Sequence, residues 1–231
     1  MPSMSTSIVL NPELVKDTSP RTYVIFGSPR GGTSMVAGIC RIMGLNIGED
    51  LPANCEDPDF NLEILHRQQV ETSGHLPDAL AKRKQQVETS VHLWNAIAER
   101  NQKLATWGWK YPRASHYLPD LISGLRNPHF VCIFRDMVSI AKRPIHGKER
   151  NSEGALKMAH QLVSNNIKLI TDSKVPTLVL SYEHALMNRK EFCQDIAGFL
   201  GSEDSEALVA AENYIEPSGG YQGVPEPVAR L

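Results

Sequence analysis

Gly27-Ser28-Pro29-Arg30-Gly31-Gly32-Thr33-Ser34 stands between a short apolar run, residues 23–26, and a segment with apolar residues at helical spacing, residues 33–43. Glycines permit the tight turn that joins a strand to a helix, and they aim successive backbone amides at one point. The N-terminus of a helix adds favourable partial charge for an anion. Thr33 and Ser34 can donate hydroxyl hydrogen bonds to the same anion. This order of elements predicts a phosphate-binding loop of the P-loop type.

The loop departs from the pattern of P-loops that bind nucleoside triphosphates. That pattern has Lys directly before the hydroxyl residue, where this chain has Thr33. The cation stands earlier, at Arg30. A kinase of a small metabolite, requiring ATP and Mg²⁺, is one alternative, and the missing Lys argues against it. A glycine-rich turn that binds nothing is another, and the coincidence of strand, glycines, cation and hydroxyls argues against that.

The remaining sequence predicts an α/β fold. Short apolar runs predict strands and 3.6-residue periodicity predicts helices between them. Strands are expected at 23–26, 106–110, 129–134 and 177–180, and helices at 33–43, 62–70, 78–103, 114–125, 152–172, 189–200 and 205–214. Such alternation favours a three-layer P-loop-type fold with a central, mostly parallel sheet flanked by helices.

The domain organisation is expected to be simple. Residues 1–20, which are rich in Ser and Thr, are predicted to form a flexible N-terminal arm. Residues 21–216 form a single domain, and residues 217–231, with several Gly and Pro, form a loop-like C-terminal tail.

Composition narrows the class of protein. Lys and Arg number 24 against 26 Asp and Glu, a formal net charge of −2, so no global basic field exists to bind nucleic acid. The four cysteines form no CxxC pair and the eight histidines show no metal-ligand spacing, which predicts reduced thiols and no metal. No signal peptide or run of membrane-spanning length is evident, so we expect a cytoplasmic protein without a membrane partner. Oligomeric state leaves no mark in the sequence.

The phosphate loop resembles the 5′-phosphosulfate loop of sulfotransferases that use 3′-phosphoadenosine 5′-phosphosulfate (PAPS), bacterial type, whose usual form is Pro-(Arg/Lys)-Ser-Gly-Thr-(Thr/Ser). Five positions match: Pro29, Arg30, Gly32, Thr33 and Ser34. Gly31 replaces the usual Ser, which leaves its backbone amide to serve as the donor.

The resemblance implies a donor, a product and roles for the loop. The donor is PAPS, the product is 3′-phosphoadenosine 5′-phosphate (PAP), and no metal is needed. Arg30 contacts the leaving phosphosulfate oxygen, and the rest of the loop binds the donor. Those remaining donor-binding residues are Ser28, Pro29, Gly31, Gly32, Thr33 and Ser34.

A second landmark, Phe130-Val131-Cys132-Ile133-Phe134-Arg135-Asp136, resembles the family's 3′-phosphate-binding element. Arg135 at a strand end can bind a phosphate bidentately. Where the family usually has a Ser, this chain has Arg143, and Ser139 lies nearby on a different helical face. Either residue is a candidate second ligand. An ordinary surface pair of Arg135 and Asp136 is the alternative.

Further landmarks follow in the family's order, covering roughly residues 22–201. Residues 107–113 resemble the Trp-x-x-Lys-x-Pro stretch of bacterial relatives, which implies that Lys110 stabilises charge at the transferred group. A core strand with a solvated Lys is the other interpretation. Ser181-Tyr182-Glu183 resembles the family's Tyr-Glu pair, which implies that Tyr182 lies near the adenine.

The acceptor side is the least defined. Asp57-Pro58-Asp59-Phe60-Asn61-Leu62-Glu63 fits the family's acceptor motif loosely, so Glu63 is the candidate base. His66, one turn later on the same helical face, is the alternative, and both can equally be solvated. We expect transfer to a hydroxyl or amine of a small-molecule or carbohydrate acceptor, with residues 48–103 shaping its pocket. A catalytically inactive nucleotide-binding relative remains a further possibility.

Overall fold

The computed structural model describes residues 7–15, 20–72, 78–142, 151–216, 223–229 and 231. The strands are β1 (Ser7–Leu10), β2 (Arg21–Gly27), β3 (Thr106–Lys110), β4 (Pro128–Phe134) and β5 (Thr177–Ser181). The α-helices are α1 (Thr33–Ile42), α2 (Leu62–Thr72), α3 (Asp78–Lys103), α4 (Leu118–Leu121), α5 (Met137–Lys142), α6 (Ser152–Asp172), α7 (Tyr182–Met187), α8 (Arg189–Leu200) and α9 (Ser205–Tyr214). The 3₁₀ helices are η1 (Pro12–Leu14), η2 (Pro58–Phe60), η3 (Ala114–His116) and η4 (Ile122–Gly124).

The strands form one sheet in the order β1-β5-β4-β2-β3. All neighbours are parallel except β1, which pairs antiparallel with β5. β2 lies between β3 and β4, and Ile25 of β2 stands opposite both Lys110 and Val131. The predicted α/β class with a mostly parallel sheet is confirmed.

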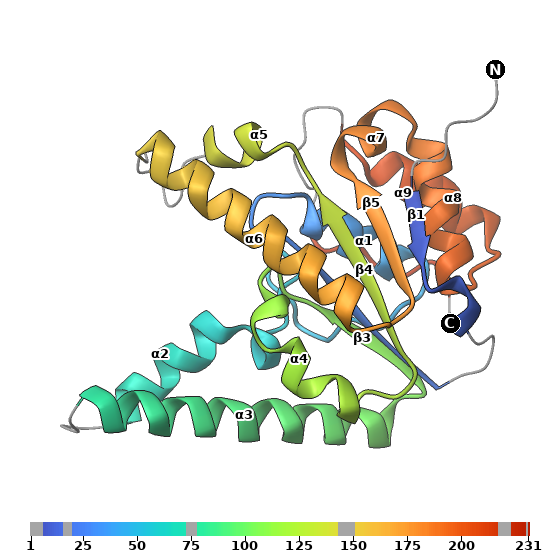
Figure 1. Ribbon diagram of the computed structural model, residues 1–231. Coiled ribbons are helices and arrows are strands. Elements are labelled where there is room, and N and C mark those ends of the chain that lie inside the picture. The colour runs from blue at the N-terminus through green and yellow to red at the C-terminus, as the bar shows by residue number, and fades with distance from the viewer. Residues whose placement is uncertain (1–6, 16–19, 73–77, 143–150, 217–222, 230) are drawn as a thin grey trace.

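Helices cover both faces of the sheet, giving three layers (Figure 1). Successive residues of a strand point to opposite faces. Tyr23 and Ile25 pack into a core with α1, α8 and α9, whereas Val24 and Phe26 pack into a second core with α3, α4 and α6. Every residue of β2 is buried, as expected for a central parallel strand.

For this topology a crevice is expected at the carboxyl ends of β2 and β4. The chain leaves β2 toward α1 on one face, and it leaves β4 toward α5 and α6 on the other. Connections that diverge in this way open a ligand-binding crevice in α/β sheets. The predicted phosphate loop connects β2 to α1, so it lies at this crevice.

Three observations differ from or extend the sequence predictions. Within the predicted flexible arm, residues 7–10 form strand β1, because they find hydrogen-bonding partners on β5. The single helix expected at 114–125 is instead the succession η3, α4 and η4, since Pro119 favours a helix start rather than its interior. In the tail, the amides of Val228 and Ala229 donate to the carbonyl of Ile42, which ties this segment to α1.

The cysteines and the helices of the described residues can be characterised further. Cys40, Cys55, Cys132 and Cys193 are all buried and unpaired. Among the described helices, none is long and apolar enough to cross a membrane.

Candidate functional site

The phosphate loop adopts a tight turn held by its own backbone. The amide of Gly31 donates to the carbonyl of Ser28 at 2.8 Å, and Arg30 takes a left-handed conformation with φ 67°. The Gly31 amide is thus engaged within the loop, and its expected role toward the phosphate stays a prediction. A Cβ at Gly31 would lie 2.7 Å from the Ser28 carbonyl oxygen, so this turn disfavours a side chain at position 31.

Gly32 is the residue before α1, and its conformation shapes the N-terminus of that helix. It has φ 98°, and a Cβ there would lie 2.4 Å from Cδ2 of Tyr182. As the cap residue, it contributes no side chain to the helix terminus. The amides of the first helical turn, which begins with the buried Thr33 and Ser34, therefore receive no capping side chain from residue 32.

Arg135, at the end of β4, meets this loop. Its Nη1 donates to the carbonyl oxygen of Arg30 at 3.2 Å, and its guanidinium lies over the Tyr182 ring at 4.0 Å. Its Nε is buried without a hydrogen-bond partner among the described residues. The structure thus brings together Arg30, Arg135 and Tyr182, from the ends of three strands.

Glu183 ties the ends of β4 and β5 together. One carboxylate oxygen accepts from the amide of Asp136 at 3.0 Å, and the other accepts from the hydroxyl of Ser181 at 3.2 Å. Asp136 in turn accepts from the amide of Ser139 at 2.6 Å, and bonds from that amide and its hydroxyl lower the pKa of Asp136. Ser139 is thus engaged within α5. Arg143, the other candidate at the 3′-phosphate, lies outside the described residues.

Lys110 ends β3 and is 1% exposed, so the interpretation as a solvated lysine is wrong. Trp107 and Trp109 face the core with α3 and α6, and strand alternation turns Lys110 toward α1. Its Nζ donates to Ser34 Oγ at 3.2 Å, to the carbonyl of Asn54 at 3.0 Å and to Glu56 Oε1 at 3.0 Å. Burial lowers the pKa of Lys110, and the Glu56 carboxylate opposes that effect.

The two candidate bases lie on α2. Glu63 is exposed and pairs with Nη1 of Arg113 at 2.7 Å. Arg113 lines a small cavity together with Pro29 and Arg30, so the pair stands near the phosphate loop. His66 is exposed.

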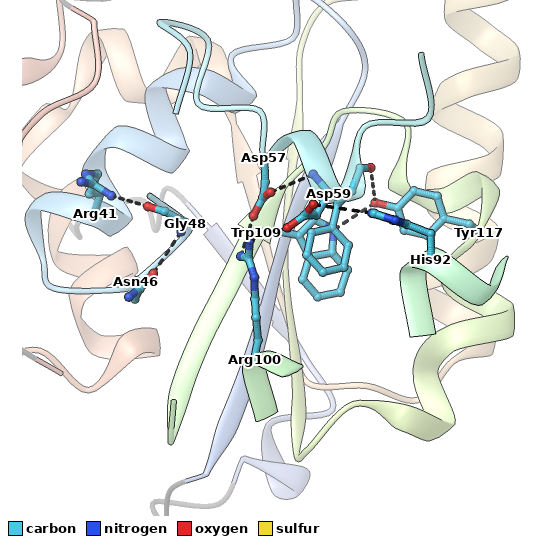
Figure 2. A network of polar contacts seen from close by, with 10 residues as sticks. Arg41, Asn46, Gly48, Asp57, Asp59, His92, Arg100, Trp109 and Tyr117 are labelled. Carbon is cyan, nitrogen blue, oxygen red and sulfur yellow. Dashed lines mark hydrogen bonds and ion pairs between the residues drawn. The ribbon is translucent and has the colours of Figure 1, made fainter. Parts of the chain in front are cut away.

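The segment 46–61 lies between these groups and is anchored along its length. Figure 2 shows Arg100 of α3 reaching the buried Asp57, at 2.5 Å. The carbonyl of Gly48 accepts from Arg41, and the carbonyl of Phe60 accepts from Tyr117. The carbonyl of Asn54 and the carboxylate of Glu56 are thereby held in place beside Lys110.

Sequence reasoning missed three contributors to this site: Glu56, Arg113 and Glu183. Glu56 stands among several acidic residues of an irregular segment, and no local pattern distinguishes it. Arg113 and Glu183 belong to segments that were recognised, but their partners, Glu63 and Asp136, lie far away in the sequence. In the part of the chain that the structure describes, no group of three or more His, Cys, Asp or Glu side chains is arranged to hold a metal.

Comparison with solved structures defines the fold. The chain is similar to the sulfotransferase domain from the Synechococcus PCC 7002 olefin synthase, with a TM-score of 0.55 and 16% identity over 91% of this chain and 83% of that one. It is also similar to the sulfotransferase domain from the curacin biosynthetic pathway, with a TM-score of 0.48 and 12% identity over 92% and 86%. No protein-family model and no curated protein matches the chain. The fold is that of a sulfotransferase-like α/β domain.

Proposed function

We propose that the protein is a PAPS-dependent sulfotransferase that transfers a sulfuryl group to a hydroxyl or amine of a small-molecule or carbohydrate acceptor. The observation that carries this proposal is the contact of Arg135 with the Arg30 carbonyl, because it places two cationic strand ends at one crevice. A nucleotide with phosphates at both its 5′ and 3′ positions needs two separate phosphate-binding groups. The side-chain-free cap at Gly32 suits one phosphate group, and the terminal guanidinium donors of Arg135 suit the other.

The proposed roles follow from position. The first-turn amides of α1, with Thr33 and Ser34, hold the 5′-phosphate, and Arg30 neutralises charge on the bridging oxygen. Arg135 holds the 3′-phosphate, with Ser139 or Arg143 as second ligand. Tyr182, which lies under the Arg135 guanidinium, offers its ring edge to the adenine.

The donor supplies a sulfuryl group and leaves as PAP; this chain orients the groups around that displacement. A bond forms from the acceptor oxygen or nitrogen to sulfur as the sulfur–oxygen bond to the phosphate breaks. Lys110, whose ammonium binds Ser34 Oγ at the start of α1, adds positive charge behind the loop that holds the donor. Glu63 takes the acceptor proton, and His66, on the same helix, is the alternative base.

A kinase is the second function that this loop type suggests. P-loop kinases hold Mg²⁺ on the hydroxyl that follows the loop lysine. Here Ser34 Oγ accepts from the Lys110 ammonium at 3.2 Å and donates to the Asn54 carbonyl at 2.9 Å. A cation at that distance opposes Mg²⁺ binding to the same oxygen, so the sulfuryl donor is favoured.

Ligand-dependent thermal stability tests the donor class. We expect PAP to raise the melting temperature strongly, and AMP or ATP with Mg²⁺ to raise it little. Incubation with PAPS and a panel of alcohols, sugars and amines, followed by detection of PAP, tests turnover. Equal stabilisation by ATP with Mg²⁺ contradicts the proposal, and PAP binding without turnover identifies an inactive relative.

A further inference from the structure

The ammonium of Lys110 is saturated by protein acceptors. A lysine Nζ carries three protons, and each faces one acceptor: Ser34 Oγ, the Asn54 carbonyl and Glu56 Oε1. Two of these three acceptors come from the irregular segment 46–61. The direction in which Lys110 points is therefore set by that segment as well as by β3.

Among these partners Glu56 is the one that carries charge. Its side chain is 16% exposed, compared with 1% for Lys110, so water screens the pair only weakly. The other titratable groups near the pair are Cys55, Tyr111 and Tyr117. Burial raises the pKa of all three, to about 12 for Tyr111, so they are neutral at physiological pH.

A nearby cation increases the need for a carboxylate that keeps Lys110 protonated. Arg41 of α1 acts on Cys55 together with Lys110, so positive charge already surrounds this corner of the fold. A buried amine in such surroundings loses its proton readily unless a carboxylate faces it. Burial lowers the pKa of Lys110 and Glu56 raises it. Glu56 is thus the anion, among the described groups facing Lys110, that can maintain its charge.

Glu56 also connects Lys110 to the helix that carries Glu63. Its Oε2 accepts from Asn61 Nδ2 at 2.8 Å. The other end of the Asn61 amide, Oδ1, accepts from the backbone amides of Glu63 at 2.9 Å and Ile64 at 3.3 Å. One carboxylate therefore contacts Lys110 at the end of β3 and Asn61, the residue directly before α2.

We propose that Glu56 is the positioning residue for Lys110: its carboxylate directs the Lys110 ammonium onto Ser34 at the N-terminus of α1 and keeps it cationic there. Through Asn61 the same carboxylate sets the start of α2. The consequence for catalysis rests on the proposed sulfuryl transfer, whereas the effect on the Lys110 ammonium does not.

Replacing the carboxylate with its neutral isostere tests this role without requiring turnover. In protein labelled with ¹³C-lysine, the Cε resonance of Lys110, assigned by its loss in Lys110→Met, reports the charge of the amine against pH. In Glu56→Gln we expect the titration midpoint to fall by roughly 1–3 pH units, the effect of removing an adjacent opposite charge. Glu99→Gln, which removes the exposed partner of Lys103, is the matched control and should leave the Lys110 midpoint unchanged.

A second readout separates positioning from simple stabilisation. With an active enzyme, the alkaline limb of the pH dependence of kcat/KM should move to lower pH in Glu56→Gln and stay in place in Glu99→Gln. Glu56→Asp keeps the charge one methylene shorter and should give an intermediate midpoint, which provides the measurement if Glu56→Gln does not fold. An unchanged Lys110 midpoint in the folded Glu56 variants overturns the inference. Absence of PAP binding with a lowered midpoint rejects the proposed function and keeps the role of Glu56.

Discussion

Nη1 of Arg135 donates a hydrogen bond to the carbonyl oxygen of Arg30 at 3.2 Å, although the two residues are far apart in sequence. The contact joins the Arg135 guanidinium at the end of β4 to the backbone of the loop after β2. Separation of these two arginines onto different surfaces would have removed the basis for a shared doubly phosphorylated ligand.

Arg135→Ala should weaken PAP binding by roughly 10- to 100-fold, because charge-assisted hydrogen bonds to phosphate contribute about 1.5–3 kcal/mol. Arg135→Lys should recover only part of this, since Lys cannot form a bidentate contact or stack on Tyr182 in the same way. Isothermal titration calorimetry measures both. Lys168→Ala, at an exposed lysine paired with Asp172, is the control. Equal affinity of Arg135→Ala and wild type places the 3′-phosphate elsewhere.

Gly32→Ala should lower the free energy of unfolding by about 1–3 kcal/mol, because Ala disfavours the left-handed backbone conformation and its Cβ would overlap Tyr182. Gly154→Ala, on α6, is the matched control: a Cβ there meets nothing within 4 Å, and helix propensity predicts a gain of up to about 1 kcal/mol. Urea unfolding measures both. A neutral effect at Gly32 means that the loop can rearrange around the added methyl group.

The buried His129 should make stability fall as the pH becomes acidic. Burial, with Arg21 nearby, lowers its pKa below the ordinary value of 6.5. Since the unfolded chain then binds the proton more tightly, the stabilisation is present above pH 6.5 and is lost as the pH falls through the folded-state pKa. His129→Phe, which suits the contacts with Tyr23 and Phe199, should reduce that loss.

Urea unfolding at pH 7.5, 6.5 and 5.5 tests this sign. His160→Gln, at an exposed histidine of α6, should keep the wild-type dependence. If His129→Phe loses as much stability between pH 7.5 and 5.5 as wild type does, the pH dependence comes from other groups.

Glu63→Gln should lower kcat by roughly 10²- to 10⁴-fold if Glu63 takes the acceptor proton, with a smaller change in KM for the donor. His66→Gln is the direct comparison, because it removes the other candidate on the same helix. The acidic limb of the pH dependence of kcat should disappear in Glu63→Gln alone. A larger loss in His66→Gln reverses the assignment of the base.

The phosphate loop and the parallel strands were predictable because their signals are local. The apolar run before the loop, its glycines and the helix after it are adjacent in sequence. Each parallel strand of the sheet was predicted to within a few residues. β1 was not predictable, since Ser7–Leu10 is a strand only through its antiparallel pairing with β5. The segmented helices at 114–124 follow from Pro119, whose effect on helix continuity outweighed apolar spacing.

The candidate site was predictable only where a residue belongs to a motif. Arg30, Lys110 and Arg135 each stand at the end of a recognisable strand. Glu56 acts through a contact with Lys110 across 54 positions of sequence, and nothing in its neighbours indicates that partner. The turn that engages the Gly31 amide likewise depends on three-dimensional loop geometry that composition does not encode.

β2 pairs in register with both β3 and β4, and this pairing determines where the strand ends lie. Ile25 pairs with Lys110 on one side and Val131 on the other. The backbone positions of the loop, Lys110 and Arg135 are therefore all fixed relative to β2. The segment between α1 and β3, residues 44–105, lies outside the strand residues that pair β2 with β3 and β4. Insertions or deletions in that segment can reshape the surroundings of the loop while the register of the strand backbones is preserved.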